Sequence, residues 1–269
     1  MLFAPMLVAI LLGLVEGATE FLPVSSTGHL ILAGGMLDFT GPRAATFEIV
    51  IQLGAILAVV WHYRATLWSL MTRCLSDPIE RRLTLNLALG FLPAAVIGVL
   101  AHDWIKTNLF SPTTVAAALV IGGVVMLLLE WARPAVVTED VRQVSPRQAF
   151  GVGCAQVLAM IPGTSRSAAT ILGGYALGLS RPAATEFSFL LAIPTIIGAA
   201  GFDLIKSRDL LSSADIPMFA VGTLVAFLSA LAVIRMFLRF IERHSFAAFA
   251  WYRIAFGGLL FVLFALRVM

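Results

Sequence analysis

The chain has 269 residues, of which 60% are apolar and only 12% are Asp, Glu, Lys or Arg. Soluble domains carry about 25% charged residues, so this composition excludes an ordinary soluble enzyme, a disordered protein and a nucleic-acid binder with a basic surface. The formal net charge of +3 says little by itself, because the positions of the basic residues matter more than their sum. Cys74 and Cys154 form no spacing typical of a disulfide framework or a metal site. The sequence therefore predicts an integral membrane protein.

Six stretches are long and apolar enough to cross a bilayer, which takes about 20 residues of helix. We therefore predict an all-α fold with about six full transmembrane helices. In chain order the predicted spans are residues 45–62, 83–101, 107–129, 185–202, 216–234 and 250–266.

Two further apolar regions, residues 6–37 and 148–179, are interrupted by polar residues and prolines. Non-helical backbone at membrane depth persists only where protein buries it or where it lines a wet cavity. Each region therefore predicts a re-entrant segment, in which two short helices are joined by a loop inside the membrane.

The two interrupted regions resemble each other. Pro23 lies 139 residues before Pro162, and with a one-residue shift Glu16 matches Gln156. Each half then holds one broken segment and three spans, and an odd number of crossings inverts the second half, as in many transporters. The sequence predicts an inverted-repeat helical bundle. It forms a single transmembrane domain over residues 1–269, with repeat 1 at about 1–134 and repeat 2 at about 145–269.

The basic residues are distributed unequally between the two sides of the predicted bundle. Thirteen, including Arg166 and Arg253, are placed on one side and five on the other. Because cytoplasmic loops are rich in Lys and Arg, we place the richer side in the cytoplasm and both termini outside. The five residues of the poorer side are Arg43, Lys106, Lys206, Arg208 and Arg267.

Two carboxylates lie in the first interrupted region. Glu16 and Glu20 are four residues apart, so on a helix they share one face. Two buried carboxylates repel each other unless one is protonated or a cation lies between them, and carboxylate oxygens suit Mg²⁺ or Ca²⁺. The alternative is a solvated helix end. We predict a divalent-cation site at this pair.

Hydroxyl side chains follow these carboxylates at the expected start of a helix, where free N–H groups bind anions. Ser25, Ser26 and Thr27 form this run, and His29 lies within the same turn. Ser26 is a candidate nucleophile with Glu20 or His29 as its base. The alternative is an ordinary capped helix start.

The second break combines hydroxyl groups with a cation. Arg166 offers a rigid set of donors that matches phosphate or carboxylate. A structural ion pair with Glu16 or Glu20 is the alternative, and it does not exclude a phosphate role. The candidate substrate-binding residues of the two breaks are Ser25, Thr27, Gly163, Thr164, Ser165, Ser167 and Thr170.

Residues 16–29 (EGATEFLPVSSTGH) and 162–170 (PGTSRSAAT) resemble the two signature segments of the bacterial undecaprenyl-diphosphate phosphatases of the bacitracin-resistance type. The resemblance implies an inner-membrane enzyme that removes the terminal phosphate of undecaprenyl diphosphate and regenerates the monophosphate carrier used in cell-envelope synthesis. It also implies a divalent cation and a site that opens to the periplasm. Glu16, Glu20, Ser26, His29 and Arg166 match the functional positions of that family.

Two mechanisms stay open from the residues alone: attack by Ser26, or attack by a metal-activated water with Ser26 only binding phosphate. A transporter or flippase for a phosphorylated lipid is the competing class. It would use the helix ends and Arg166, but it has little need for paired carboxylates beside Ser26 and His29. The expected partners are a polyprenyl diphosphate and membrane lipids, without nucleic acid, and a homodimer is left open.

Overall fold

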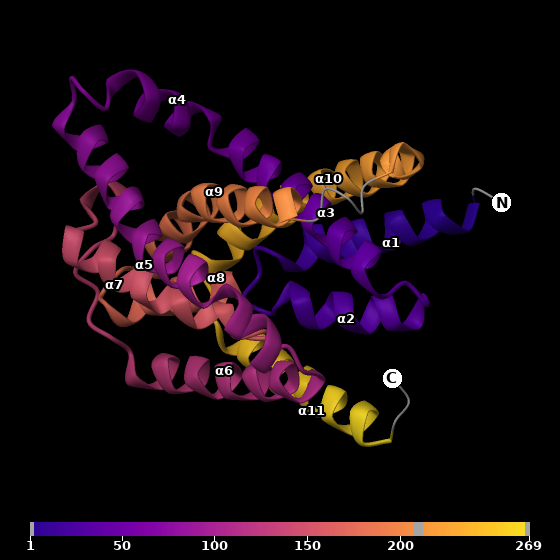
Figure 1. Cartoon of the computed structure of the whole chain (residues 1–269). Helices are drawn as coiled ribbons and strands as arrows, with labels where there is room; N and C mark the ends of the chain where they lie inside the picture. Colours follow the sequence, from indigo (N-terminus) through magenta and orange to yellow (C-terminus); the bar gives the residue numbers. More distant parts are fainter. Residues whose placement is uncertain (1–2, 207–211, 267–269) are drawn as a thin grey trace.

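The computed structural model describes residues 3–206 and 212–266. Within these residues six helices are long and apolar enough to cross a membrane, and each coincides with a predicted span (Figure 1). They are α3 (Pro42–His62), α5 (Pro78–Asn108), α6 (Pro112–Ala132), α9 (Arg181–Lys206), α10 (Ile216–Ile241) and α11 (Ala247–Ala265). The predicted all-α membrane fold with six spans is confirmed.

The starts of these helices follow from local sequence. Asp77 accepts a hydrogen bond from the backbone N–H of Ile79, and Ser111 accepts one from Thr114, so each caps the helix that follows. A proline stands at the first position of both helices, where its missing N–H removes no helical hydrogen bond.

Both interrupted regions form pairs of short helices. The first pair is α1 (Phe3–Thr19) and α2 (Ser26–Met36), and the second is α7 (Pro146–Val157) and α8 (Arg166–Ala176), with the 3-10 turn η2 (Leu158–Met160) between them. Figure 1 shows the α1–α2 pair extending inward from the end that holds both termini and the α7–α8 pair extending from the opposite end. Their breaks meet in the interior, where Ser167 Oγ donates to Leu22 O over 2.8 Å. That the pairs are re-entrant in a bilayer stays a prediction.

Helices of the two halves pack against each other in corresponding pairs: α1 on α10 and α7 on α5, α3 on α10 and α9 on α5, and α6 on α11. Glycine allows the closest approaches. A Cβ at Gly17 would lie 2.3 Å from Ala226 O, and one at Gly153 would lie 2.4 Å from Gly90 O. Such paired contacts are what an inverted repeat produces, and the repeat boundaries themselves stay a prediction.

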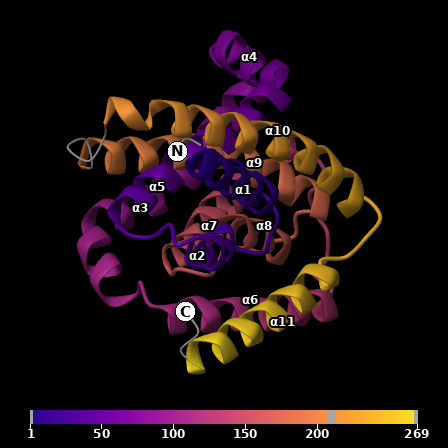
Figure 2. The same ribbon diagram turned by 90° about the vertical axis from the view of Figure 1, so that its right-hand side faces the viewer.

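One helix was not expected from the sequence. Helix α4 (Arg64–Arg73) follows α3 directly and projects beyond the rest of the bundle (Figure 2). The segment lies between the predicted spans 45–62 and 83–101, and its ten residues are too few to cross a bilayer. Two more 3-10 turns, η1 (Val141–Gln143) and η4 (Ser213–Asp215), lie in connections.

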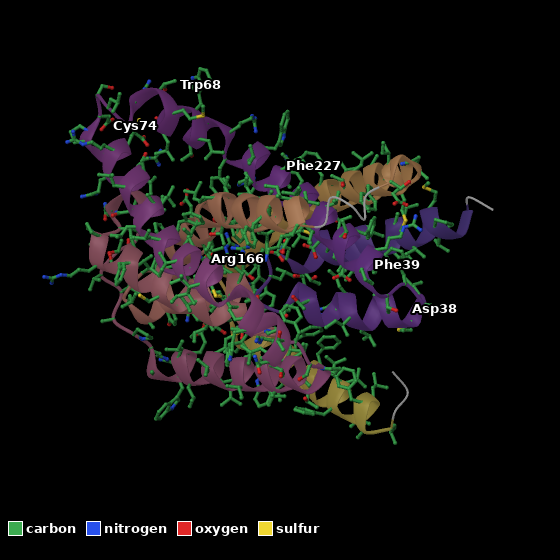
Figure 3. All side chains as sticks on the ribbon, in the orientation of Figure 1. Asp38, Phe39, Trp68, Cys74, Arg166 and Phe227 are labelled. Carbon is green, nitrogen blue, oxygen red and sulfur yellow. The ribbon has the colours of Figure 1, made fainter. Side chains whose placement is uncertain are left out.

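The structure corrects the position of one arginine used for orientation. Arg253 is counted with the cytoplasmic side, but it lies within α11, inside the predicted span 250–266, and its exposed fraction is 0%. Arg166 is also in the interior, between the end marked by Asp38 and the end marked by Cys74 in Figure 3. Without these two, eleven basic residues remain on the richer side against five. Arg208 and Arg267 lie outside the described residues.

Candidate active site

The two breaks share one backbone conformation. Ser25 precedes α2 with φ of 70° and Ser165 precedes α8 with φ of 73°, so both occupy the left-handed region that non-glycine residues rarely adopt. These serines are 140 residues apart, which is the same shift that relates Glu16 to Gln156. The turn directs the first residue of each short helix, Ser26 or Arg166, toward the meeting point of the two halves.

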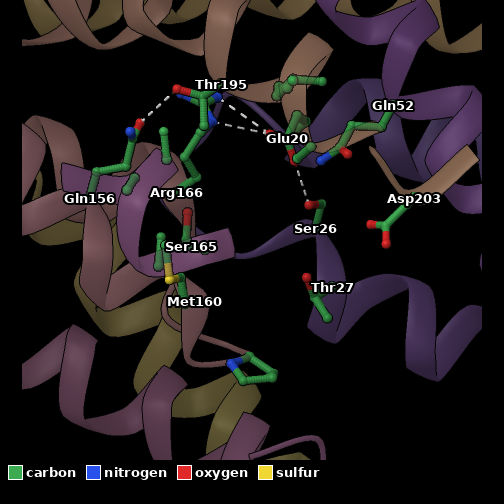
Figure 4. A pocket seen from close by; sticks show the side chains of 18 of the residues that line it. Glu20, Ser26, Thr27, Gln52, Gln156, Met160, Ser165, Arg166, Thr195 and Asp203 are labelled. Carbon is green, nitrogen blue, oxygen red and sulfur yellow. Dashed lines mark hydrogen bonds and ion pairs between the residues drawn. The ribbon is translucent and has the colours of Figure 1, made fainter. Parts of the chain in front are cut away.

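Ser26, Glu20 and Arg166 form the centre of the site (Figure 4). Ser26 Oγ donates to Glu20 Oε2 over 2.7 Å. Arg166 Nη2 and Nε lie 3.3 and 3.4 Å from the other carboxylate oxygen, Oε1. Glu20 is only 5% exposed, so its hydroxyl and guanidinium partners offset the cost of burying its charge. The predicted pairing of Arg166 with Glu20 is present, and the same carboxylate holds the hydroxyl of Ser26.

A cavity of about 460 Å³ opens beside this centre. Its polar end includes Glu20, Ser26 and Arg166, and its walls come mainly from α5 and α9. Pro93 lies inside α5 and Pro194 lies inside α9 at this level, and a proline inside a helix removes one backbone hydrogen bond. The apolar wall residues are Phe91, Ala94, Ala95, Gly98, Val99, Ile196, Gly198, Ala199 and Phe202. The cavity therefore joins a charged end to a mostly apolar channel, which Asp203 also lines.

His29 is not among the residues that line this cavity. Its Nδ1 lies 2.7 Å from Ser25 O, a carbonyl that can only accept, so Nδ1 carries the proton. Nε2 then accepts from the hydroxyl of Tyr252 in α11 at 2.6 Å, and the ring stacks on Phe256. Both ring nitrogens of His29 therefore have hydrogen-bond partners, and the Ser26 hydroxyl donates to Glu20 rather than to His29. A catalytic role for His29 stays a prediction.

The other predicted binding residues divide into two groups. Ser25, Thr27, Gly163 and Ser165 line the cavity. Ser167 and Thr170 are buried and hydrogen-bonded within the protein, Ser167 to Leu22 O and Thr170 to Arg166 O, while Thr164 supplies a backbone carbonyl to Arg253. The second group supports the breaks rather than facing the cavity.

Glu16 is 1% exposed and does not line the cavity, and its Oε1 has no hydrogen-bond partner. Among the described residues no group of three His, Cys, Asp or Glu side chains is placed to hold a metal ion. Mg²⁺ commonly takes one or two carboxylates and completes its shell with water and substrate phosphate. Because Glu16 and Glu20 supply two carboxylates and one oxygen lacks a partner, the residues present fit a divalent cation.

Arg253 connects the two breaks, a structural role that the sequence analysis missed. Its Nη1 donates to Pro23 O at 3.2 Å in the first break and to Thr164 O at 3.0 Å in the second. Its Nη2 donates to Gly163 O at 3.1 Å, and further donors reach carbonyls of α6. One side chain thus ties both breaks to α6 and α11. The signal was present, since an arginine within an apolar span is costly unless it has buried partners.

The fold and the site together define a multi-pass helical membrane protein with a buried acid–hydroxyl–guanidinium centre. The sequence model of the family described as "Bacitracin resistance protein BacA" matches residues 9–259, so the chain belongs to the BacA family. It is 54% identical over 249 residues to "Undecaprenyl-diphosphatase 1" of Pseudomonas fluorescens strain Pf0-1, covering 93% of this chain and 90% of the relative. It is 53% identical over 252 residues to "Undecaprenyl-diphosphatase" of Pseudomonas aeruginosa strain UCBPP-PA14, covering 94% and 91% of the two chains.

Proposed function

We propose that the chain is an undecaprenyl-diphosphate phosphatase, which hydrolyses the terminal phosphate of the lipid diphosphate and leaves the lipid monophosphate. One observation carries the proposal: the Ser26 hydroxyl and the Arg166 guanidinium are held by the same buried carboxylate, Glu20, at the polar end of an apolar cavity. The names of the relatives agree with it. A transporter would need an anion site but not the hydrogen bond between Ser26 and Glu20, and for this reason hydrolysis is preferred.

In the preferred mechanism Ser26 Oγ attacks the terminal phosphorus. Its proton passes to Glu20, which already accepts the hydroxyl hydrogen bond. The bond between the terminal phosphorus and the bridging oxygen breaks, and its electron pair leaves with the lipid monophosphate. Water then hydrolyses the phosphoserine. Arg166 stabilises the negative charge on the phosphate oxygens throughout, through donors in a fixed planar geometry.

In the rival mechanism water attacks directly and Ser26 only binds phosphate. Rapid quenching during turnover separates the two, because only attack by Ser26 leaves phosphate covalently attached at that position. Mass spectrometry of the quenched chain, with Ser26→Ala as the control, provides the measurement. Turnover without any trapped phosphoserine would favour direct attack by water.

Glu16 and Glu20 would hold the divalent cation, Mg²⁺ or Ca²⁺. Bound there, the cation would neutralise charge on the diphosphate oxygens. Glu16 is four residues from Glu20 along the chain, and the backbone N–H of Glu20 donates to Glu16 O over 2.9 Å, so a helical turn connects them.

The proposed location is the bacterial inner membrane, with the site open to the periplasm. The cavity extends along α5 and α9 to Val99 and Phe202, toward the end of the molecule that holds both termini. That end is the side with fewer basic residues, which supports an outward-facing opening.

The deciding experiment measures phosphate release from a prenyl diphosphate by purified full-length protein, with and without a chelator. We expect release that the chelator abolishes and added Mg²⁺ or Ca²⁺ restores. Absence of release with every divalent ion tested would rule out the phosphatase, whereas release that continues in chelator would rule out only the cation.

A further inference from the structure

Gln156 and Thr195 form a second polar position in the cavity that the mechanism above does not use. Gln156 lies in the last turn of α7 and Thr195 lies in α9, directly after Pro194. Both line the cavity. The Thr195 hydroxyl donates to Leu191 O over 2.8 Å, and its Oγ1 also lies 3.3 Å from Gln156 Oε1. The amide nitrogen, Nε2, is buried and has no hydrogen-bond partner, and Gln156 as a whole is only 2% exposed.

An unpaired amide nitrogen in this environment is unfavourable. A buried donor without a partner costs about 1–3 kcal/mol. The amide carries two N–H donors and no charge, and its oxygen lies beside the Thr195 hydroxyl, whose single proton is shared with Leu191 O. The nitrogen is therefore placed to receive an acceptor supplied by a ligand in the cavity.

The position of Gln156 indicates which part of a ligand it meets. In the view of Figure 4, Gln156 lies on the opposite side of Arg166 from Ser26. A diphosphate whose terminal phosphate lies at Ser26 and which is gripped by Arg166 would extend its second phosphate toward Gln156. The residue that corresponds to Gln156 in the first half is Glu16. A carboxylate at Gln156 would repel this phosphate, whereas the amide donates to it.

We propose that Gln156 donates hydrogen bonds from its unpaired Nε2 to the phosphate that remains on the lipid. This inference rests on the proposed function and adds to it a binding residue that distinguishes the two phosphates of the substrate. Ser26, Glu20 and Arg166 act on the terminal phosphate, and Gln156 holds the leaving phosphate, which is also the phosphate of the product.

The test measures binding rather than turnover, so that it is independent of hydrolysis. Purified full-length protein in detergent is titrated with farnesyl monophosphate, which carries only the lipid-side phosphate, and with farnesol, which carries none. We expect Gln156→Leu to weaken binding of farnesyl monophosphate about tenfold or more, because a hydrogen bond to a charged group is lost. Farnesol binding should be unchanged.

Two further variants distinguish the loss of this contact from a loss of folding. Gln156→Glu keeps the size of the side chain but replaces the donors with a carboxylate, so it should weaken monophosphate binding more than Gln156→Leu. Thr195→Val removes the hydroxyl that lies beside the amide oxygen and bonds to Leu191 O, and it should weaken monophosphate binding less. Thermal unfolding of each variant, compared with the parent chain, establishes that the fold is retained.

Three results would overturn the inference. Unchanged monophosphate binding in both Gln156 variants would exclude the contact. Equal weakening for farnesyl monophosphate and farnesol would indicate a packing role instead. An unchanged monophosphate affinity together with a raised KM for the diphosphate would place Gln156 at the terminal phosphate. Loss of hydrolysis by the parent chain, with Gln156-dependent monophosphate binding retained, would refute the proposed phosphatase but not this binding site.

Discussion

The two breaks of this protein use one backbone geometry for opposite chemistry. Each contains a serine with positive φ followed by a helix of 11 residues. In the first break Ser26 is the first residue of that helix and Glu20 precedes the helix. In the second break Arg166 takes the position that corresponds to Ser26. Where the first half has Glu16, the second has Gln156. The first half thus supplies the acid and the hydroxyl, and the second supplies the cation and a neutral donor.

This difference explains why neither half forms a site alone. Glu20 by itself would be a buried carboxylate and Arg166 a buried guanidinium, each costly without the other. Brought together at 3.3 Å, they compensate each other's charge and leave Ser26 hydrogen-bonded to the remaining carboxylate oxygen. The two breaks share a backbone geometry but carry different side chains. Together they form a centre with an acid, a hydroxyl group and a guanidinium group, which neither half contains alone.

The largest effect is expected from Glu20→Gln in the first break. The amide keeps the size of the side chain but cannot take the proton of Ser26, so kcat should fall by about 10²–10⁴-fold. Initial rates of phosphate release provide the measurement. Glu16→Gln is the matched control on the same segment. It should mainly raise the concentration of divalent cation needed for half-maximal rate. A Glu20→Gln variant with more than a tenth of the original kcat would refute the assigned base.

In the second break, Arg166→Lys should lower kcat/KM by about 10²-fold, because an ammonium group cannot replace the planar set of donors. The control is Arg181→Lys, since Arg181 also pairs with a glutamate, Glu130, over 2.9 Å, but lies outside the cavity lining. That variant should lower the thermal unfolding midpoint and leave kcat/KM nearly unchanged. Equal kinetic losses in both variants would show that the arginine at the break has no special role.

Arg253 holds the two breaks together, so Arg253→Met should affect both. It removes hydrogen bonds to the carbonyls of Pro23, Gly163 and Thr164, and each hydrogen bond to a charged group contributes about 1.5–3 kcal/mol. We expect the free energy of unfolding to fall by about 3 kcal/mol or more, together with a loss of activity. Denaturation in detergent measures the first quantity. Arg253→Lys, which keeps the charge, should recover part of the stability. Unchanged stability in the methionine variant would contradict the connecting role.

The smallest effect is expected from Tyr252→Phe. The change removes the hydroxyl that donates to His29 Nε2 over 2.6 Å, and the second break has alanine, Ala169, where the first has His29. Loss of one neutral hydrogen bond contributes about 1 kcal/mol, so kcat should fall by less than about fivefold. If the fall reached the size of the Glu20→Gln effect, His29 would belong to the proton-transfer path. Phosphate release across pH, compared with the parent chain, makes that distinction.

Much of the architecture was predictable because it depends on local composition. The six spans follow from runs of apolar residues, and the two breaks follow from polar residues that a lipid-exposed helix does not tolerate. Helix α4 was missed because its ten residues, from Arg64 to Arg73, are too few for the sequence pattern to distinguish a helix from a loop. The placement of Arg253 was wrong for a similar reason: one charge near the expected end of a span gives no indication of its depth.

The sequence by itself determined that this chain is a helical membrane protein with two matching breaks. It identified the unusual polar residues in them, which are Glu16, Glu20, Ser26, His29 and Arg166. These conclusions rest on the cost of placing charge and free backbone in lipid, which composition and spacing reveal. Only the tertiary structure decided that Glu20 holds Ser26 with one oxygen and Arg166 with the other, that His29 turns to Tyr252, and that Arg253 links the breaks. Those contacts join residues up to 230 positions apart, and no local pattern encodes such distances because they arise from how the helices pack.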